Sequence, residues 1–239
     1  MNMYFSLITP NPGYERTAAH EWLRSSYAEH QWLWRFFPAP KGTARDFLFR
    51  RRDVDRLPRY YTVSSRPPET DSQAWHVQSR AYQPRIPAGT RLSFDLRANP
   101  AISRTHESGA RRHDVVMDEK KRLLAARGLP SWESWAPDRT IADAGPDPRP
   151  PLYDLVHRTC SGWLATRAEQ HGFTLDASSL TVAAYQQHGG KNGQLRFSTV
   201  DYGGELVVTN EQRFANALIV GIGRAKAFGC GLLLVRRVA

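Results

Sequence analysis

Two side chains that can take part in proton transfer stand close together in the stretch YAEHQWLWRFFP, namely Tyr27 and His30. Histidine has an unperturbed pKa of about 6.5 and can serve as a base or an acid near neutral pH. Tyrosine, with a pKa of about 10, is better suited to orienting a substrate or donating a hydrogen bond. Residues at this spacing are neighbours on one helix face, so the two groups can converge on one reacting centre.

The surroundings of His30 predict that it lies on the apolar face of a helix. Apolar residues recur at helical spacing on that face: Trp22, Leu23, Tyr27, Leu33, Trp34 and Phe37. A titratable group there must find a hydrogen-bond partner inside the fold or lie at the edge of a cleft, because burying it alone costs free energy. The pattern by itself favours a packed histidine and leaves the second interpretation open.

A glycine-rich segment, GIGRAKAFGCGLL, lies near the end of the chain and includes Gly221 and Gly223. It is no dinucleotide or phosphate loop of the usual kind, because the predicted order is helix, loop, strand, and those motifs need strand, loop, helix. Its glycines could let the main chain approach a partner, with Arg224 and Lys226 supplying charge for phosphates. The alternative is a helix C-cap followed by a turn.

The sequence contains no motif typical of metal binding or of acyl transfer. The sequence holds no HExxH motif, no paired aspartates and no GxSxG elbow, so we expect no metal site, no cofactor and no acyl-transfer nucleophile. The only two cysteines, Cys160 and Cys230, are far apart and predict reduced thiols. The N-terminal apolar run is too short for a signal peptide and no segment has the length of a membrane span, which favours a cytoplasmic protein with no membrane partner.

The charge of the chain favours a polyanionic partner. Lysine and arginine number 33 against 23 acidic residues, a net charge of +10, which attracts nucleic acid before specific contacts form. A solvated basic surface is the alternative. Residues 97–127 carry eight basic side chains against four acidic ones; Arg111 and Arg112 are the best candidates for RNA contacts, followed by Arg97, Lys120 and Lys121. Residues 120–122 could equally form the solvated face of a helix.

The first part of the chain predicts the order β-α-β-β-α-β. A strand over 3–8 precedes one long helix over 14–37, which Pro38 ends. Three strands follow over 44–50, 59–65 and 74–82, with a short helix between 67 and 73. This order is typical of a ferredoxin-like domain, which we expect over 1–82, with a linker over 83–90.

The same order is predicted again over 91–239. A strand over 91–97 and a helix over 153–172 are separated by an insertion over about 99–151 that is helical near 119–126. Strands over 179–187, 194–202 and 204–210, a helix over 211–223 and a strand over 230–238 complete it. The glycine-rich loop spans 221–231. The expected fold is therefore α+β, with two tandem ferredoxin-like, or RRM-like, βαββαβ domains.

Four stretches together resemble the CasE (Cse) family of CRISPR-associated endoribonucleases of type I-E systems. YAEHQWLWRFFP, ARDFLFR, LSFDLRANP and GIGRAKAFGCGLL occur in the family's order. The resemblance implies a metal-independent cut on the 3′ side of a CRISPR repeat stem-loop RNA, leaving a 2′,3′-cyclic phosphate and a 5′-hydroxyl. It also implies that the protein retains its product as a subunit of the type I-E surveillance complex.

The resemblance assigns the catalytic roles to Tyr27 and His30. Attack by a 2′-hydroxyl requires a proton to leave the nucleophile and another to reach the departing oxygen, which suits a histidine; which residue is base and which is acid stays open. Lys191 and Arg196 are candidates for stabilising the phosphate charge, the alternative being a turn with an exposed lysine. The competing function is a non-catalytic tandem RRM-like RNA-binding subunit.

Overall fold

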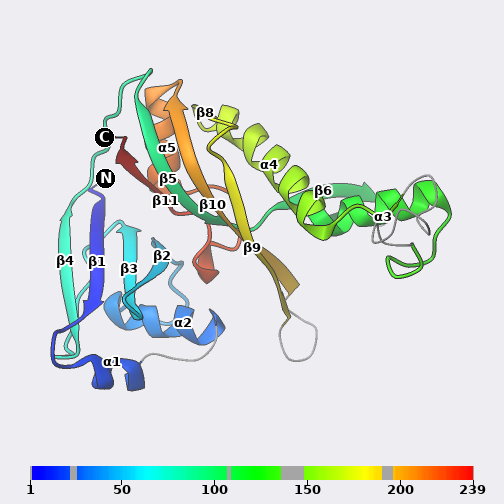
Figure 1. Cartoon of the computed structure of the whole chain (residues 1–239). Helices are drawn as coiled ribbons and strands as arrows, with labels where there is room; N and C mark the ends of the chain where they lie inside the picture. Colours follow the sequence, from blue (N-terminus) through cyan, green and yellow to red (C-terminus); the bar gives the residue numbers. More distant parts are fainter. Residues whose placement is uncertain (1, 22–25, 107–108, 136–147, 190–195, 239) are drawn as a thin grey trace.

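Two antiparallel sheets with helices packed around them form the body of the molecule (Figure 1). The computed structural model describes residues 2–21, 26–106, 109–135, 148–189 and 196–238. The fold is mixed α+β, as expected from the sequence. Within the described residues no helix has the length and apolar character needed to cross a membrane.

The first sheet has the strand order β2-β3-β1-β4, with every neighbouring pair antiparallel. Its strands are β1 (Tyr4–Pro10), β2 (Phe47–Val54), β3 (Leu57–Ser64) and β4 (Trp75–Ala81). All four strands were anticipated by the alternation of the sequence, with boundaries shifted by a few residues. One face of this sheet packs on an aromatic core in which Trp32, Tyr60 and Trp75 contact one another edge to face or at a tilt.

The long helix expected over 14–37 is described in shorter pieces. They are α1 (Glu15–Glu21), α2 (Ser26–Leu33) and the 3-10 turn η1 (Trp34–Phe36); residues 22–25 lie outside the described part. Leu33 and Phe37 are fully buried, which confirms the later part of the apolar stripe on which His30 was placed; the side chains of Trp22, Leu23 and Tyr27 lie outside the described part. The stripe ends at Phe37, whose carbonyl oxygen accepts a hydrogen bond from Arg66, directly before the helix-breaking Pro38.

The prediction of a short helix between residues 67 and 73 is wrong. Residues 65–74 contain no helix, because Pro67 and Pro68 lack the backbone N–H groups that a helix would use. The segment is instead tied to the first helices: Glu69 N donates to the Phe36 carbonyl at 2.8 Å and the Ser72 hydroxyl donates to Glu21 at 3.0 Å. It therefore covers the aromatic core as an extended strap.

The second sheet has the order β11-β5-β10-β8, with β9 also pairing with β10. Its strands are β5 (Arg91–Ala98), β8 (Phe173–Leu175), β9 (Thr181–Gly189), β10 (Arg196–Val208) and β11 (Leu233–Arg237). The two strands expected over 194–202 and 204–210 are one continuous strand, β10, because Gly203 and Gly204 allow the chain to pass Thr181 and Ser179 closely. The short β8 was not expected.

Two helices pack on the second sheet and share its core. They are α4 (Leu152–Gln170) and α5 (Glu211–Val220). Asn210 caps α5 by accepting a hydrogen bond from Arg213 N at 2.9 Å. Leu164 and Phe214 are fully buried in the same cluster, so both helices fix the sheet from which the candidate site is built.

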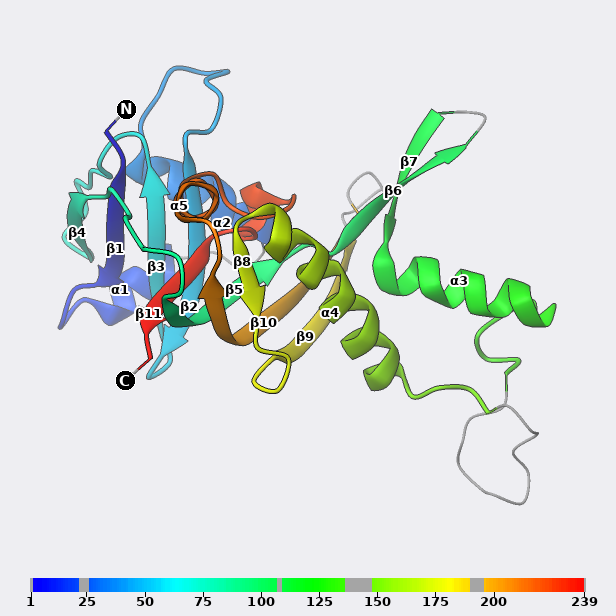
Figure 2. The same cartoon turned by 90° about the horizontal axis from the view of Figure 1, so that it is seen from above.

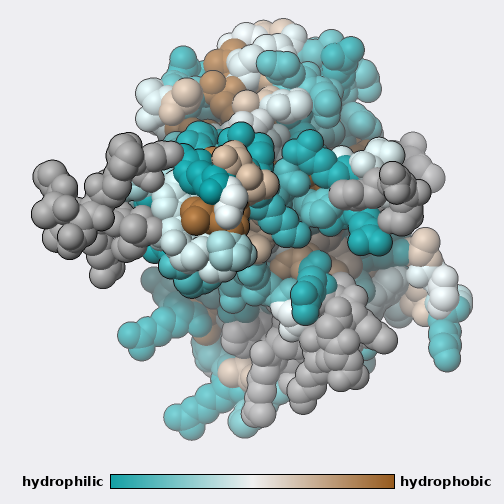
Figure 3. All heavy atoms as spheres, turned by 90° about the vertical axis from the view of Figure 1, so that its right-hand side faces the viewer, coloured by the Kyte–Doolittle hydropathy of each residue, from teal (hydrophilic) through white to brown (hydrophobic). Residues whose placement is uncertain are grey.

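The insertion projects away from this body (Figure 2). It contains a hairpin of β6 (Ala101–His106) and β7 (Gly109–Asp114), followed by α3 (Val115–Arg127). The helix expected near 119–126 is confirmed; the hairpin was not expected. Asp114 caps α3 and Gly128 ends it in the left-handed conformation. The side of the molecule on which α3 lies is predominantly hydrophilic (Figure 3).

A buried charge network and a small apolar cluster join the two sheets. Arg50 on β2 is only 2% exposed and donates to Asp95 on β5 at 2.8 Å, with Asp201 on β10 at 3.3 Å. Arg52 also contacts Asp95. Beside these ion pairs Leu48 and Val63 pack against Leu232. The sheets are therefore held in a defined orientation by contacts that cross between them.

Candidate functional site

His30 lies on α2 where this helix meets the C-terminal part of the chain. The His30 ring is 6.4 Å from Trp34 and 6.3 Å from Phe228, measured between centroids. Phe228 belongs to the 3-10 turn η3 (Lys226–Phe228), which packs against α2 and β2. His30 Nδ1 is buried and has no hydrogen-bond partner among the described residues. Within the described residues, His30 Nδ1 therefore lacks the hydrogen bond that the packed-histidine interpretation requires.

Burial lowers the pKa of His30, and the positive charge of Arg45 lowers it further. Both causes disfavour the imidazolium form. The neutral imidazole, with one ring nitrogen able to accept a proton, is therefore the prevailing form of His30 at neutral pH.

The other two residues expected to be catalytic are only partly described. Tyr27 lies on α2 one turn before His30, which agrees with the expected helical spacing, but its side chain lies outside the described part. Lys191 falls within 190–195, which also lies outside the described residues. The approach of Tyr27 to His30 and the role of Lys191 in stabilising the phosphate charge stay predictions.

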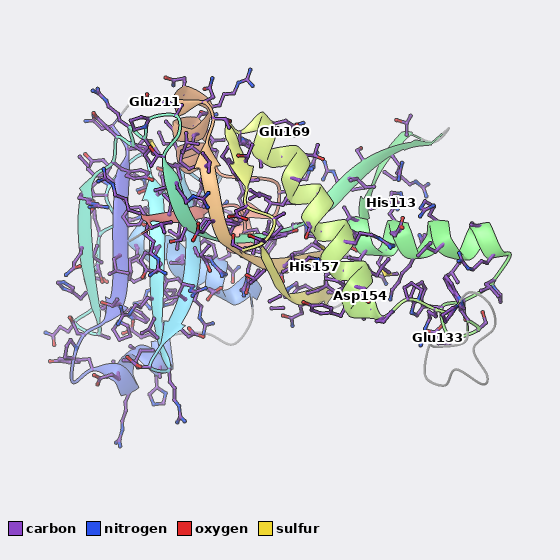
Figure 4. All side chains as sticks on the ribbon, turned by 45° about the horizontal axis from the view of Figure 1, so that its top comes forward. His113, Glu133, Asp154, His157, Glu169 and Glu211 are labelled. Atoms are coloured by element: carbon purple, nitrogen blue, oxygen red, sulfur yellow. The ribbon has the colours of Figure 1, made fainter. Side chains whose placement is uncertain are left out.

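A cleft of about 600 Å³ opens beside η3. The hairpin β6–β7 and the start of α3 form one wall, and β9, β10 and the loop after α5 form the other. Figure 4 shows His113 on the wall that the hairpin and α3 form. Phe228 lines the cleft and also contacts His30, so it links the two.

Positive side chains line the cleft. They are Arg112 from β7, Arg196 from β10 and Arg224 from the loop after α5, all exposed. Asp114 is the only carboxylate in the described lining, and its oxygens already accept hydrogen bonds from Met117 N, the Tyr185 hydroxyl and the Ser198 hydroxyl. The cleft therefore presents net positive charge to a ligand.

Stacked rings form part of the cleft wall. Phe197 stacks on Phe228 with centroids 4.7 Å apart, and His188 stacks on Phe197 at 4.6 Å. His188 Nε2 lies 2.9 Å from the Thr199 hydroxyl. The stack is continuous with the contact between Phe228 and His30, so an aromatic path connects β9 with α2. These rings were not expected from the sequence, because His188 and Phe197 stand on separate strands, β9 and β10, and Phe228 stands near the end of the chain.

The glycines of the 221–231 loop face protein atoms. A Cβ on Gly221 would lie 2.8 Å from both Leu48 Cδ1 and the Gly231 carbonyl, and one on Gly223 would lie 3.2 Å from the Trp163 ring. Ile222 N donates to the Gly231 carbonyl at 2.8 Å and closes the loop. Close packing inside the protein therefore explains these glycines, while exposed Arg224 points to the cleft.

The remaining predicted RNA contacts have different surroundings. Arg97 is engaged by Asp201 through two hydrogen bonds of 2.7 Å. Lys120 lies 4.9 Å over the Trp132 ring, whereas Arg111 and Lys121 are exposed outside the cleft lining. Lys226 is partly buried, and burial lowers the pKa of its ammonium group.

A family model described as "CRISPR associated protein" matches residues 3–237. The chain belongs to this family. It falls in the CasE/Cse3/Cas6e group of type I-E systems: it is 26% identical over 218 residues to the CRISPR system Cascade subunit CasE of Escherichia coli (strain K12), covering 90% of this chain and 94% of that protein.

Solved structures of the CasE group share this fold. Thermus thermophilus Cse3, bound to an RNA representing a pre-cleavage complex, matches with a TM-score of 0.64 and 20% identity, covering 99% of this chain and all 100% of that one. Cas6e from Escherichia coli K-12 matches with a TM-score of 0.57 and 20% identity, over 98% and 100% of the two chains. Within the described residues of this CasE-family chain, no three His, Cys, Asp or Glu side chains are grouped to hold a metal ion.

Proposed function

We propose that this protein is a metal-independent endoribonuclease that cuts CRISPR precursor RNA on the 3′ side of a repeat stem-loop. One observation carries the proposal: His30, with an unpaired ring nitrogen, is joined through Phe228 to a cleft lined by exposed arginines. An imidazole that is mostly neutral can take or pass a proton in a site that also attracts phosphates.

In the proposed reaction the ribose 2′-oxygen attacks the adjacent phosphorus and the bond from phosphorus to the 5′-oxygen breaks. The 2′-hydroxyl proton is lost to a base and the departing 5′-oxygen gains a proton, leaving a 2′,3′-cyclic phosphate and a 5′-hydroxyl. We assign one of these two proton transfers to His30, and assign to Tyr27 the orientation of the ribose-phosphate or the other transfer. Lys191 is proposed to stabilise the charge on the phosphate.

The RNA stem is proposed to lie along the basic cleft. Arg112, Arg196 and Arg224 would contact its phosphates, since the narrow major groove of A-form RNA leaves shape and backbone as the main features to recognise. Exposed Arg111 and Lys121 extend the positive surface beyond the cleft.

The two sheets are proposed to be two ferredoxin-like domains over 1–82 and 91–239. The strand orders β2-β3-β1-β4 and β11-β5-β10-β8 support this interpretation, because the first strand of each unit, β1 or β5, lies between its last strand, β4 or β11, and a middle strand. This is the arrangement expected of the split βαβ order. In the first unit the described residues 65–74, where the second helix was expected, contain no helix. On this proposal one unit supplies His30 and the other most of the cleft.

Retention of the product within a larger assembly is the second part of the proposal. The Escherichia coli relative is named as a subunit of Cascade. We propose that this protein likewise stays on the processed RNA and takes its place in a type I-E surveillance complex.

Cleavage of a repeat RNA hairpin in EDTA tests the function. We expect the wild-type protein to cut, a 2′-deoxy substitution at the cleavage site to block cutting, and His30→Ala to lose cutting while binding the RNA. His20→Ala, which removes an exposed histidine from α1, is the matched control and should cut normally. Cutting by His30→Ala at the wild-type rate would refute the assignment, and binding without cutting by the wild-type protein would favour a non-catalytic RNA-binding subunit.

A further inference from the structure

Arg45 contacts the same turn, η3, that His30 contacts, and it was not expected from the sequence to take part in the site. It precedes β2, and its Nη1 donates a hydrogen bond to the backbone carbonyl of Lys226 in η3. Its guanidinium carbon is 5.4 Å from the centroid of the Phe47 ring. These two contacts hold a positive charge at the junction of α2, β2 and η3, and that charge acts on the His30 ring.

The guanidinium of Arg45 has no carboxylate partner among the described residues, although it is partly buried. The nearby arginines differ: Arg50 pairs with Asp95, and Arg66 pairs with Asp46 at 2.8 Å. Burying a cation without a counter-ion costs free energy. Burial lowers the pKa of Arg45 to about 10, which still leaves it charged at neutral pH. An anion bound next to His30 would offset that cost.

We propose that Arg45 is a catalytic residue that binds a non-bridging oxygen of the scissile phosphate beside His30. This inference rests on the proposed function. The guanidinium has five N–H donors, and the Lys226 carbonyl takes one of them, so donors remain for a phosphate. The contact to Lys226 and the Phe47 ring fix the orientation of the guanidinium before the RNA binds, which is what transition-state stabilisation requires.

Arg45 transfers no proton in this step. When the 2′-oxygen attacks and before the bond to the 5′-oxygen has broken, the phosphorus carries five oxygens and additional negative charge on the non-bridging ones. A fixed positive charge stabilises that state more than the starting phosphodiester. The proton balance of the reaction is unchanged, because the two transfers stay with His30 and its partner.

Single-turnover cleavage at saturating RNA, with binding measured separately on a 2′-deoxy repeat hairpin, tests the inference. We expect Arg45→Gln to lower the cleavage rate constant by about 10²-fold, the usual effect of removing one such donor, and to weaken binding by less than about 10-fold. Arg45→Lys keeps the charge but loses the planar guanidinium, so its cleavage rate constant should lie between those of the wild type and Arg45→Gln. Arg35→Gln, which removes a 48% exposed arginine from η1, is the matched control and should cut at the wild-type rate.

A sulfur substitution at each non-bridging oxygen of the scissile phosphate separates direct contact from a structural role. If Arg45 contacts one oxygen, its replacement by sulfur should slow the wild-type protein and slow Arg45→Gln much less, because the contact is already lost. Equal sulfur effects in both proteins, or a wild-type rate for Arg45→Gln, would overturn the inference. His30→Ala is run in parallel: if it cuts at the wild-type rate the proposed function fails, whereas if only Arg45→Gln behaves as wild type the inference alone fails.

Discussion

The ring of Phe228 lies against the imidazole of His30, with centroids 6.3 Å apart, although the two residues come from opposite ends of the chain. The contact exists because η3 packs on α2 and because the buried Arg50 network holds the second sheet against the first. The environment of the candidate catalytic histidine is thus supplied by the C-terminal loop.

Replacing Phe228 should change both the pKa of His30 and the rate of cleavage. Burial is the main cause that lowers the His30 pKa, so Phe228→Ala should raise this pKa toward the ordinary value of about 6.5. We expect the cleavage rate to fall by about 10-fold because the imidazole loses a packing surface. An NMR titration of His30 and a single-turnover assay measure the two effects.

Phe228→Leu keeps most of the apolar volume and should stay closer to wild type in both measurements. Tyr153→Ala removes a 69% exposed aromatic side chain and controls for loss of a ring elsewhere. An unchanged His30 titration in Phe228→Ala would show that Phe228 does not shape the environment of the imidazole.

Stability should fall as the pH drops below about 6.5, the ordinary pKa of histidine. Burial lowers the pKa of His30, His171 and His188 in the folded protein. In this range the unfolded chain therefore binds protons that the folded chain does not, and the free energy of unfolding decreases until the pH passes the folded-state pKa values. Urea unfolding at pH 7.5 and pH 5.5 measures the loss.

Between pH 7.5 and pH 5.5 the free energy of unfolding of His171→Gln should decrease less than that of the wild type. The charges that act on His171 are Lys226 and Arg167, and both lower its pKa in addition to burial. Carboxylates such as Asp201, whose pKa is also lowered, titrate at lower pH, so they contribute outside this window. A variant whose stability decreases as much as that of the wild type would exclude His171 as a contributor.

Arg50 and Arg52 share Asp95 as a partner but should differ in their effect on stability. Arg50 is 2% exposed and contacts both Asp95 and Asp201, so Arg50→Met removes a buried cation from two carboxylates that keep only Arg52 and Arg97 as partners among the described residues. This change should reduce the free energy of unfolding by about 2 kcal/mol. Arg52 is 50% exposed, and Arg52→Met should cost less than about 1 kcal/mol. Chemical unfolding of the two variants measures both free energies. Equal decreases would show that the burial of Arg50 does not increase its contribution to stability.

The arginines of the cleft should contribute to RNA binding through charge. Alanine variants of Arg112, Arg196 and Arg224 should each weaken binding of a 2′-deoxy repeat hairpin and reduce the slope of log affinity against log salt by about 1. Arg122 is held by Glu119 on α3 through hydrogen bonds of 2.7 and 2.8 Å, so Arg122→Ala is a control in which the slope stays constant. Binding measured across a series of salt concentrations gives these slopes. If every variant had the same slope as the wild type, the RNA would not bind along the cleft.

Local patterns in the sequence were sufficient for most elements. Alternation predicted the strands of both sheets except the short β8, helical spacing placed His30 on α2, and a helix was expected within α3. The errors arose where local signals were weak or misleading. Pro67 and Pro68 prevent the helix expected there. The strands β6 and β7 carry mostly polar residues, so they lack the apolar alternation typical of a strand.

The surroundings of His30 depend on the tertiary structure. Phe228 and Arg45 reach it through contacts between distant segments, which neither periodicity nor spacing encodes. The same holds for Arg97: its charge was visible in the sequence, but its two hydrogen bonds to Asp201 on the neighbouring strand were not. The types and spacing of the residues were enough to identify the groups that are chemically able to act and the element that carries each of them. The packing of the two sheets decided which of these groups meet, because burial and pairing depend on neighbours that are remote along the chain.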